Sequence, residues 1–139
     1  MFYYTKQEIL MLEIGSSPKC IAELEQFVET ISKRYHISED KYPDILISLT
    51  EAVNNAMIHG NRLSANKKIQ ISYSFCNASI SFKVSHQGRG FDPGMVADPT
   101  SVENIHKCGG RGIYLMKNLC NRVEYSNQGK TVELEFSIH

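Results

Sequence analysis

The chain has 139 residues, 42% of them hydrophobic, which fits one domain spanning residues 1–139 with a sizeable core. Fifteen basic and fifteen acidic residues cancel, and no run approaches the roughly 20 apolar residues that cross a bilayer, so we expect neither direct nucleic-acid binding nor membrane insertion. Four widely spaced cysteines without a Cys-x-x-Cys pair, and an N-terminus without a signal-peptide pattern, predict a cytoplasmic protein with reduced thiols.

The first half of the chain carries signals for strands followed by two helices. Residues 2–14 mix aromatic and aliphatic side chains in partial alternation, which predicts one or two short strands. The segment Ser16-Ser17-Pro18 is typical of a helix start, because a hydroxyl caps the first turn and proline fits there. Apolar residues at helical spacing extend this helix to the loop 36–41. A second helix starts around Tyr42-Pro43-Asp44 and is expected to end near Gly60-Asn61.

The second helix carries the most informative pattern in the chain. Each residue of an α-helix turns by about 100°, so Glu51, Asn55 and His59 fall within a sector of roughly 80°. Val53 and Met57 lie on the opposite side, where apolar residues pack against a core. A carboxylate, an amide and an imidazole in a row could present a general base and a metal ligand to a bound phosphate. The same row also fits an ordinary solvated polar face.

Alternating patterns in the second half predict two hairpins separated by an irregular segment. Apolar and polar residues alternate over residues 69–84 and again over 123–138, as in strands with one buried face. Between them, residues 85–112 lose regular periodicity and hold six of the nine glycines, before a short helix near residue 113. These elements predict an α+β fold of two layers, with helices on one face of a mixed, mainly antiparallel sheet.

Two glycine clusters lie in the irregular segment, Gly88 with Gly90 at its beginning and Gly110-Arg111-Gly112 at its end. Glycine lets the backbone approach a ligand closely, and a helix N-terminus offers free N–H groups that favour phosphate. The spacing matches neither a Walker loop nor a dinucleotide-binding fingerprint. An irregular segment of ~20 residues is uncommon in a small domain without a function, so a binding lid is favoured over a plain surface loop.

Three blocks, in this order, resemble the GHKL (histidine kinase-like) ATP-binding domain: Glu51-x-x-x-Asn55-x-x-x-His59-Gly60-Asn61, Gly88-x-Gly90-Phe91-Asp92 and Gly110-x-Gly112-Ile-x-Leu-Met. The small size and the Gly-Arg-Gly-Ile-Tyr-Leu-Met-Lys-Asn-Leu helix are most similar to the bacterial anti-sigma factor serine/threonine kinases. The resemblance covers residues 8–137. It implies a Bergerat-type ATP-binding fold, a two-layer α/β sandwich, with ATP and Mg²⁺ as cofactors.

The resemblance implies a role for each polar residue of the second helix. Asn55 would coordinate the Mg²⁺ that bridges the phosphates, and Glu51 would orient or deprotonate the hydroxyl of a protein serine or threonine. His59 and Asn61 would help shape the phosphate and lid side of the site. One metal ligand and one base can be enough, because phosphoryl transfer depends chiefly on positioning and charge neutralisation.

The resemblance also gives the later motifs contacts with the nucleotide. Gly88 and Gly90, followed by Asp92, would let the backbone pass close to the base and sugar. The segment Gly110-Arg111-Gly112 would cradle the β- and γ-phosphates at the helix N-terminus. Thr131, in the turn of the last hairpin, matches a threonine that supports adenine binding in the family.

Residue 86 departs from the family pattern. The first glycine box of the family begins with an aspartate two residues before the first glycine, and this chain has His86 there. The aspartate accepts a hydrogen bond from the adenine amino group, whereas a neutral imidazole has one acceptor nitrogen and no charge. Since charge-assisted hydrogen bonds are roughly twice as strong as neutral ones, we expect weaker or altered base recognition.

The function that the resemblance implies is an ATP-dependent serine/threonine protein kinase of the anti-sigma type. Such a protein binds a sigma factor and phosphorylates a small antagonist protein in bacterial transcription regulation, and the family suggests a homodimer. The alternative is a non-catalytic anti-sigma or adaptor protein with weakened nucleotide binding, which His86 favours. A sensor histidine kinase fragment is disfavoured, because no helical hairpin with a phospho-accepting histidine precedes the domain.

Overall fold

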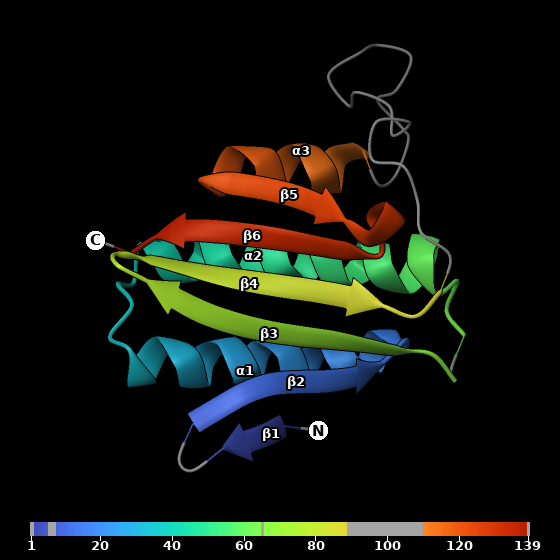
Figure 1. The fold of residues 1–139 in the computed structure, drawn as a ribbon, viewed down its shortest axis with the longest axis horizontal. Helices are drawn as coiled ribbons and strands as arrows, with labels where there is room; N and C mark the ends of the chain where they lie inside the picture. The colour runs from blue at the N-terminus through green and yellow to red at the C-terminus, as the bar shows by residue number, and fades with distance from the viewer. Residues whose placement is uncertain (1, 6–7, 65, 89–109, 139) are drawn as a thin grey trace.

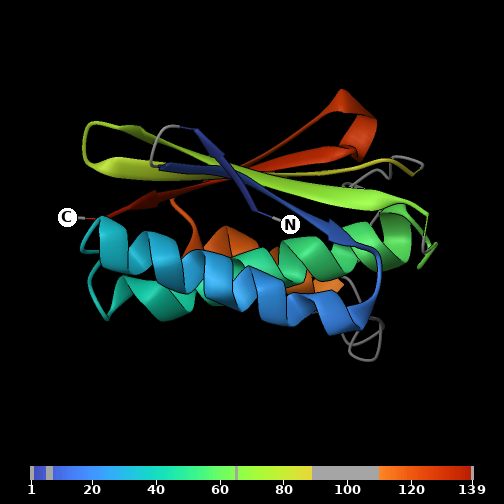
Figure 2. The ribbon, with the colours of Figure 1, turned by 90° about the horizontal axis from the view of Figure 1, so that it is seen from below.

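One sheet and a layer of helices make up the described part of the chain (Figures 1 and 2). The computed structural model describes residues 2–5, 8–64, 66–88 and 110–138, with the backbone alone for residues 2–5, 8–10 and 110–114. Figure 2 shows the three α-helices on one side of the sheet, and no α-helix of the described residues covers its other face. The predicted α+β fold with two layers is therefore confirmed.

The sheet has six strands in the order β1-β2-β3-β4-β6-β5, and every described pairing is antiparallel. The sequence predicted a mixed, mainly antiparallel sheet. The second and third strands pair antiparallel because the two helices between them run out and back. The chain therefore returns to the end where the second strand stopped, and Gly15 pairs with Lys68 there. The strands are β1 (Phe2–Thr5), β2 (Glu8–Gly15), β3 (Lys68–Cys76), β4 (Ser79–His86), β5 (Arg122–Ser126) and β6 (Thr131–Ser137).

The helices begin where the sequence indicates. Ser17 accepts a hydrogen bond from the Lys19 N–H at 3.4 Å and opens a 3-10 turn, Pro18–Cys20, that leads into α1 (Ile21–Arg34). The next helix, α2 (Lys41–Asn55), continues without a break into the π-helical turn η2 (Ala56–Gly60). The short helix α3 (Gly110–Leu119) follows the glycine-rich segment.

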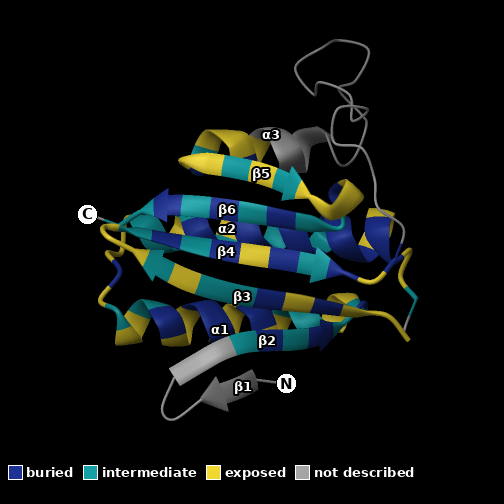
Figure 3. Cartoon of the chain, viewed as in Figure 1, coloured by how far each residue is buried: buried dark blue, intermediate teal, exposed yellow. Residues whose placement is uncertain are grey.

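The core lies between the sheet and the helices, where alternate strand residues and one face of each helix are buried (Figure 3). On β4 and β6 the buried residues alternate with half-buried or exposed ones, as the period of two predicts. The ring of Phe82 lies 6.2 Å from that of Phe136 and 6.4 Å from that of Tyr73, in the middle of the sheet. The largest fully buried side chains are Phe27, Phe82, Phe136, Leu12, Leu24, Ile31, Ile45, Leu49, Met57, Ile69, Ile71 and Ile80.

The opposite face of the sheet is polar and carries ion pairs. Arg122 on β5 contacts Glu124 and also Glu133 of β6 at 3.0 Å, and Lys83 on β4 lies 3.7 Å from the same Glu133. Such exposed pairs each contribute only about 0–1 kcal/mol, so the buried face dominates the stability of the sheet. Within the described ranges, no helix combines the length and the apolar character needed to cross a bilayer.

Four chain segments meet at one end of the sheet. Figure 1 shows that α2 and β4 end there, while β6 and α3 begin there. Three of the features singled out from the sequence therefore lie at this end of the molecule. They are Asn55 on α2, His86 on β4, and Gly110-Arg111-Gly112 at the start of α3.

Candidate functional site

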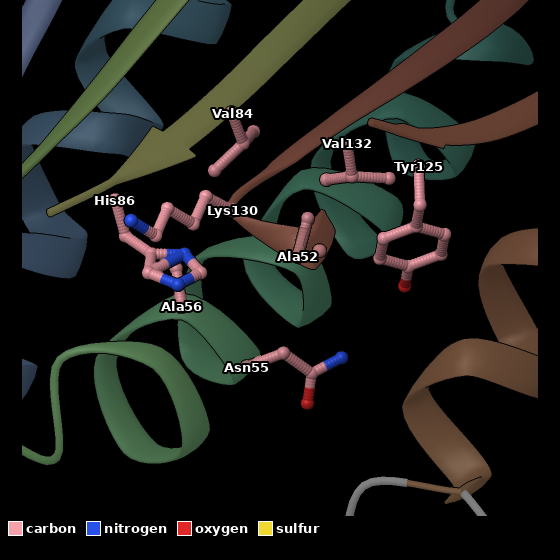
Figure 4. A pocket seen from close by; sticks show the side chains of 9 residues that line it. Ala52, Asn55, Ala56, Val84, His86, Tyr125, Lys130 and Val132 are labelled. Carbon is pink, nitrogen blue, oxygen red and sulfur yellow. The ribbon is translucent and has the colours of Figure 1, made fainter. Parts of the chain in front are cut away.

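A small pocket lies where α2, β4 and the start of β6 meet (Figure 4). Its volume is about 10 Å³, which is room for about one water molecule. A nucleobase is much larger than this volume. The lining residues are Ala52, Asn55, Ala56, Val84, His86, Tyr125, Gly129, Lys130 and Val132.

Asn55 brings an unsatisfied amide to this pocket. The residue is 6% exposed, and its side-chain nitrogen has no hydrogen-bond partner among the described residues. Figure 4 shows the amide pointing away from the imidazole of His86. An unpaired buried polar group costs about 1–3 kcal/mol, so this amide is a strong candidate for contact with a ligand or an ordered water molecule.

Glu51 lies one helical turn before Asn55 on α2 and is partly exposed. It is not among the residues that line the pocket. Because residues four apart share a helix face, its carboxylate lies on the side of α2 that carries the amide. The predicted pairing of these two residues on one face therefore agrees with the continuous α-helix from Lys41 to Asn55.

His59 lies in the π-helical turn that follows α2. This turn is η2, and in it His59 is exposed and outside the pocket lining. A π-helix closes i→i+5 hydrogen bonds and takes in slightly more than four residues per turn, so residues four apart still lie on nearly the same face. The turn is therefore compatible with the predicted row of Glu51, Asn55 and His59, and the role of His59 stays a prediction.

Asn61 is fully buried and hydrogen-bonded on every side. Its side-chain nitrogen donates to the Ser16 hydroxyl at 2.7 Å and to the Lys68 carbonyl at 3.2 Å. Its side-chain oxygen accepts from the N–H groups of Gln87 at 3.1 Å and Gly88 at 2.6 Å. Asn61 therefore ties the turn after β4 to the end of η2 and to the starts of α1 and β3.

Gly60 and Gly88 are required by close contacts inside the protein. A Cβ atom on Gly88 would lie 2.0 Å from the Gly60 carbonyl oxygen, and one on Gly60 would lie 2.3 Å from the His86 ring. No side chain fits at either position without displacing its neighbour. Gly88 was expected to let the backbone pass close to a bound nucleotide; the structure gives it this internal role, and the contact with a nucleotide stays a prediction.

His86 lies over Gly60 and is 7% exposed. Burial lowers the pKa of its imidazole below the usual value, and the positive charges of Lys130 and Lys67 lower that pKa further. The backbone N–H of His86 donates to the Lys130 carbonyl at 3.0 Å, which joins the end of β4 to the residue before β6. The neutral form of His86 is therefore favoured near neutral pH.

Thr131 does not reach the pocket. Successive side chains of a strand point to opposite faces, and Val132 lines the pocket, so Thr131 points to the other face of the sheet. There its hydroxyl lies 3.0 Å from the hydroxyl of Ser85. The sequence analysis missed Lys130, which lines the pocket immediately before Thr131. Lys130 follows a turn of three left-handed residues, Asn127, Gln128 and Gly129, which direct the chain back into β6.

Burial also raises the pKa of two further groups, one that lines the pocket and one after α3. Burial raises the pKa of the Cys120 thiol to about 11, while the Ser48 hydroxyl acts in the opposite direction. Burial likewise raises the pKa of the Tyr125 phenol to about 12. Both groups therefore stay protonated near neutral pH, and they add no negative charge to the region between α2 and β5.

The structure describes only some of the remaining predicted residues. Gly90 and Asp92 lie outside the described residues. The segment Gly110-Arg111-Gly112 forms the first turn of α3, so its backbone is at a helix N-terminus, as predicted. Among the described residues, no group of three or more His, Cys, Asp and Glu side chains converges as a metal site.

Comparisons with known proteins agree with this arrangement. Residues 14–136 match the model of the histidine kinase-like ATPase domain. The serine-protein kinase RsbW of Bacillus subtilis is 22% identical over 135 residues, which cover 91% of this chain and 84% of that protein. The RsbW protein of Oceanobacillus iheyensis is 20% identical over 128 residues, which cover 87% and 80%.

A solved structure shares the fold. The crystal structure of the RsbU and RsbW domains of Rv1364c from Mycobacterium tuberculosis matches with a TM-score of 0.63 at 15% identity. The match covers 92% of this chain, which spans about a third (32%) of that longer chain. The similarity covers nearly the whole length of this chain, and the two-layer fold is the same. The chain therefore belongs to the histidine kinase-like ATPase domain family and is a distant homologue of the RsbW serine-protein kinases.

Proposed function

We propose that this chain is an ATP-dependent serine/threonine protein kinase of the anti-sigma type. In this role it binds a sigma factor and phosphorylates a small antagonist protein, and it acts as a homodimer in the bacterial cytoplasm. The family membership and the distant homology to serine-protein kinases support the proposal. The observation that carries it is the buried, unsatisfied amide of Asn55, on the same face of α2 as Glu51.

The polar residues of α2 fit the phosphate end of a nucleotide. Rotation of the Asn55 amide presents either its nitrogen or its oxygen, and an amide oxygen is a suitable ligand for Mg²⁺. The first turn of α3 offers backbone N–H groups to phosphate oxygens through Gly110-Arg111-Gly112. When bound, ATP supplies the phosphoryl group that is transferred, and Mg²⁺ offsets its negative charge.

Glu51 is the candidate base. Its partly exposed position on α2 leaves the carboxylate accessible to a hydroxyl of a second protein, one turn from the amide that holds the metal. With ATP bound, the carboxylate would orient that hydroxyl and accept its proton, while the hydroxyl oxygen would bond to the γ-phosphorus and the bond from that phosphorus to the ADP leaving group would break. Positioning of this kind is the main contribution that a protein makes to phosphoryl transfer.

A second candidate function is a non-catalytic anti-sigma or adaptor protein. It is favoured by the pocket where the base is expected, which has room for about one water molecule and is lined by His86 and Lys130. The two functions differ in whether a nucleotide binds at all, so a binding measurement separates them.

The first test is a calorimetric titration of the purified protein with ATP, with and without Mg²⁺. If the proposal holds, ATP binds, Mg²⁺ tightens the binding, and Asn55→Ala removes most of the Mg²⁺-dependent gain. Asn54→Ala, one position earlier on the same helix, is the matched control and should retain the gain. Absence of ATP binding at millimolar nucleotide would overturn the kinase and leave the adaptor.

The second test separates binding from catalysis at Glu51. Small proteins encoded next to this chain are incubated with it, Mg²⁺ and ATP labelled on the γ-phosphate. Glu51→Gln should bind ATP as the wild type does and lose at least about 100-fold in transfer rate, the contribution typical of a general base. A Glu51→Gln protein that transfers phosphate at the wild-type rate would remove Glu51 from the catalytic role.

A further inference from the structure

A second pocket lies in the helix layer, at the opposite end of α2 from the first. It is lined by the last two turns of α1, by the loop that follows α1, and by Tyr42 in the first turn of α2. Figure 1 shows this connection between α1 and α2 at the end of the molecule away from the start of β6. Because α2 is 15 residues long, roughly 20 Å separate its two ends, and the two pockets are distinct sites.

The second pocket is large enough for a ligand group. Its volume is about 480 Å³, within the range of roughly 300–1,000 Å³ that is typical of ligand pockets. Two of its lining side chains, Glu29 and Lys33, are 55% and 76% exposed, so the pocket is open to solvent. Ile37, which is buried, adds an apolar surface to the lining. A long side chain of another protein therefore has room to enter.

The charges that line this pocket favour a cation. Glu39, in the loop between the helices, makes no ion pair with any described residue. Glu29 pairs with Lys33 at 2.9 Å, but an exposed pair contributes little stability, so the Lys33 side chain can move away. The last carbonyl groups of α1 add the partial negative charge of a helix C-terminus. Two carboxylates and a helix end thus face one ammonium group.

Ser32 brings an unsatisfied hydroxyl to the same pocket. Its oxygen is buried and has no hydrogen-bond partner among the described residues, so it does not bond to the carbonyl one turn earlier, as helical serines often do. The hydroxyl of Tyr42 and the carboxylate of Glu39 are further acceptors in the lining. A guanidinium group carries five N–H donors and no acceptor, which matches a lining with several acceptors.

We propose that this pocket receives an arginine side chain of a partner protein, whose guanidinium group pairs with Glu39. The inference goes beyond the proposed function, because it concerns the far end of α2 and requires no nucleotide. The planar fork of arginine can bind both oxygens of a carboxylate, which a lysine ammonium cannot match. Its apolar stem can cover Ile37 and the Tyr42 ring. The same carboxylates repel a nucleic acid, so a protein is the partner that the charges fit.

The test is an NMR titration of the full chain, labelled with ¹⁵N, without nucleotide. The probe is the capped peptide acetyl-Gly-Gly-Arg-Gly-Gly-amide. We expect saturable shifts of the backbone amide signals of Ser32, His36, Glu39 and Tyr42, with a dissociation constant in the millimolar range, and no shift at Asn55. The peptide with citrulline in place of arginine keeps the shape without the charge and should bind at least about threefold more weakly, as for the loss of an ion pair.

A pair of variants tests the contact with Glu39. Glu39→Gln removes the carboxylate charge and should weaken binding of the arginine peptide at least about threefold. Asp40→Asn is the matched control, because it removes the same charge from the next residue, which does not line the pocket and makes no capping hydrogen bond. That variant should keep the wild-type affinity. Both residues are exposed, so both variants should fold, and their NMR spectra show whether they do.

The possible outcomes decide the inference independently of the proposed function. If millimolar arginine peptide shifts none of these four signals, or if the citrulline peptide binds as tightly, recognition of a cation here is overturned. Equal affinity of Glu39→Gln and wild type overturns the pairing with Glu39. Free arginine carries a carboxylate that the glutamates repel, so tighter binding of free arginine than of the peptide would overturn protein docking. Since every titration omits nucleotide, these failures leave the kinase proposal unchanged, and a failure to bind ATP leaves this inference unchanged.

Discussion

His86 is a buried histidine whose surroundings oppose its charged form. The ring lies over Gly60, where a Cβ atom would be 2.3 Å from it, so the imidazole cannot turn outward without opening this contact. Burial is the main cause of its lowered pKa, and the neighbouring ammonium groups of Lys130 and Lys67 add to it. Protonation of His86 therefore works against the folded state.

This environment predicts a loss of stability in mild acid. The unfolded chain takes up a proton at His86 near the usual pKa of about 6.5, and the folded chain does so only at lower pH. Between the two pKa values the unfolded state binds more protons, so the free energy of unfolding falls as the pH falls below about 6.5. Urea unfolding of wild type and His86→Gln at several pH values measures the effect.

We expect the wild type to lose more stability in this range than His86→Gln. His36→Asn is the matched control, because His36 is exposed and its positive φ of 53° suits asparagine. That variant should show the wild-type pH dependence. Equal losses in wild type and His86→Gln would mean that His86 does not carry the dependence.

At the scale of elements, Asn61 holds the pocket end of the fold together. One side chain makes four hydrogen bonds that join the residues after η2, the turn after β4, and the starts of α1 and β3. Two backbone groups in the turn, the N–H groups of Gln87 and Gly88, both donate to the side-chain oxygen of Asn61. The position of the turn after β4 therefore depends on residue 61.

Asn61→Ala should destabilise the protein by about 2–4 kcal/mol, because it leaves the buried Gly88 N–H and the Ser16 hydroxyl without this partner. Asn54→Ala is the control for an asparagine on the neighbouring helix and should change the free energy of unfolding by less than about 0.5 kcal/mol. Urea unfolding of both variants gives the comparison. If Asn61→Ala changes the free energy of unfolding as little as Asn54→Ala does, the hydrogen bonds of Asn61 do not stabilise this end of the fold.

The elements themselves could be predicted because one-sided burial leaves a periodic pattern. Ile80, Phe82 and Val84 alternate on β4, and Leu49 and Val53 repeat at helical spacing on α2; all five are buried. Asn55 was found because it lies on the regular part of its helix. These positions depend only on local geometry, which a single sequence records.

The positions that could not be predicted lie where the regular geometry ends. The π-helical turn η2 was not predicted because its five residues leave no periodic signal of their own. Lys130 was missed because a shift of one residue at the start of a strand exchanges the two faces of the sheet. The left-handed turn at Asn127, Gln128 and Gly129 fixes that register, and its conformation is not evident from residue types alone.

At the scale of the whole molecule, buried aromatic rings stabilise the centre of the sheet. Phe82 is fully buried on β4, with the rings of Tyr73 and Phe136 about it at 6.4 and 6.2 Å. These three residues lie on three adjacent strands, β3, β4 and β6. Phe82 therefore connects the two halves of the sheet through its buried face.

Phe82→Ala should lower the free energy of unfolding by about 3–5 kcal/mol, since it removes a buried ring and leaves a cavity. That is a large part of the 5–15 kcal/mol typical of a domain, so the midpoint of urea unfolding should fall steeply. Ser81→Ala, the neighbouring residue on the polar face, should change it by no more than about 0.5 kcal/mol. A small effect of Phe82→Ala would show that the sheet centre can collapse around the loss.

The buried thiol of Cys120 gives the molecule a built-in reporter of its own opening. It lies directly after α3, close to Ser48 of α2, and with a pKa of about 11 it is almost entirely in the unreactive thiol form at neutral pH. A thiol reagent can reach and alkylate it only while α3 is lifted from α2. The rate of its modification therefore reports how often the two helices separate, in the same molecule whose pocket lies between α2 and the sheet.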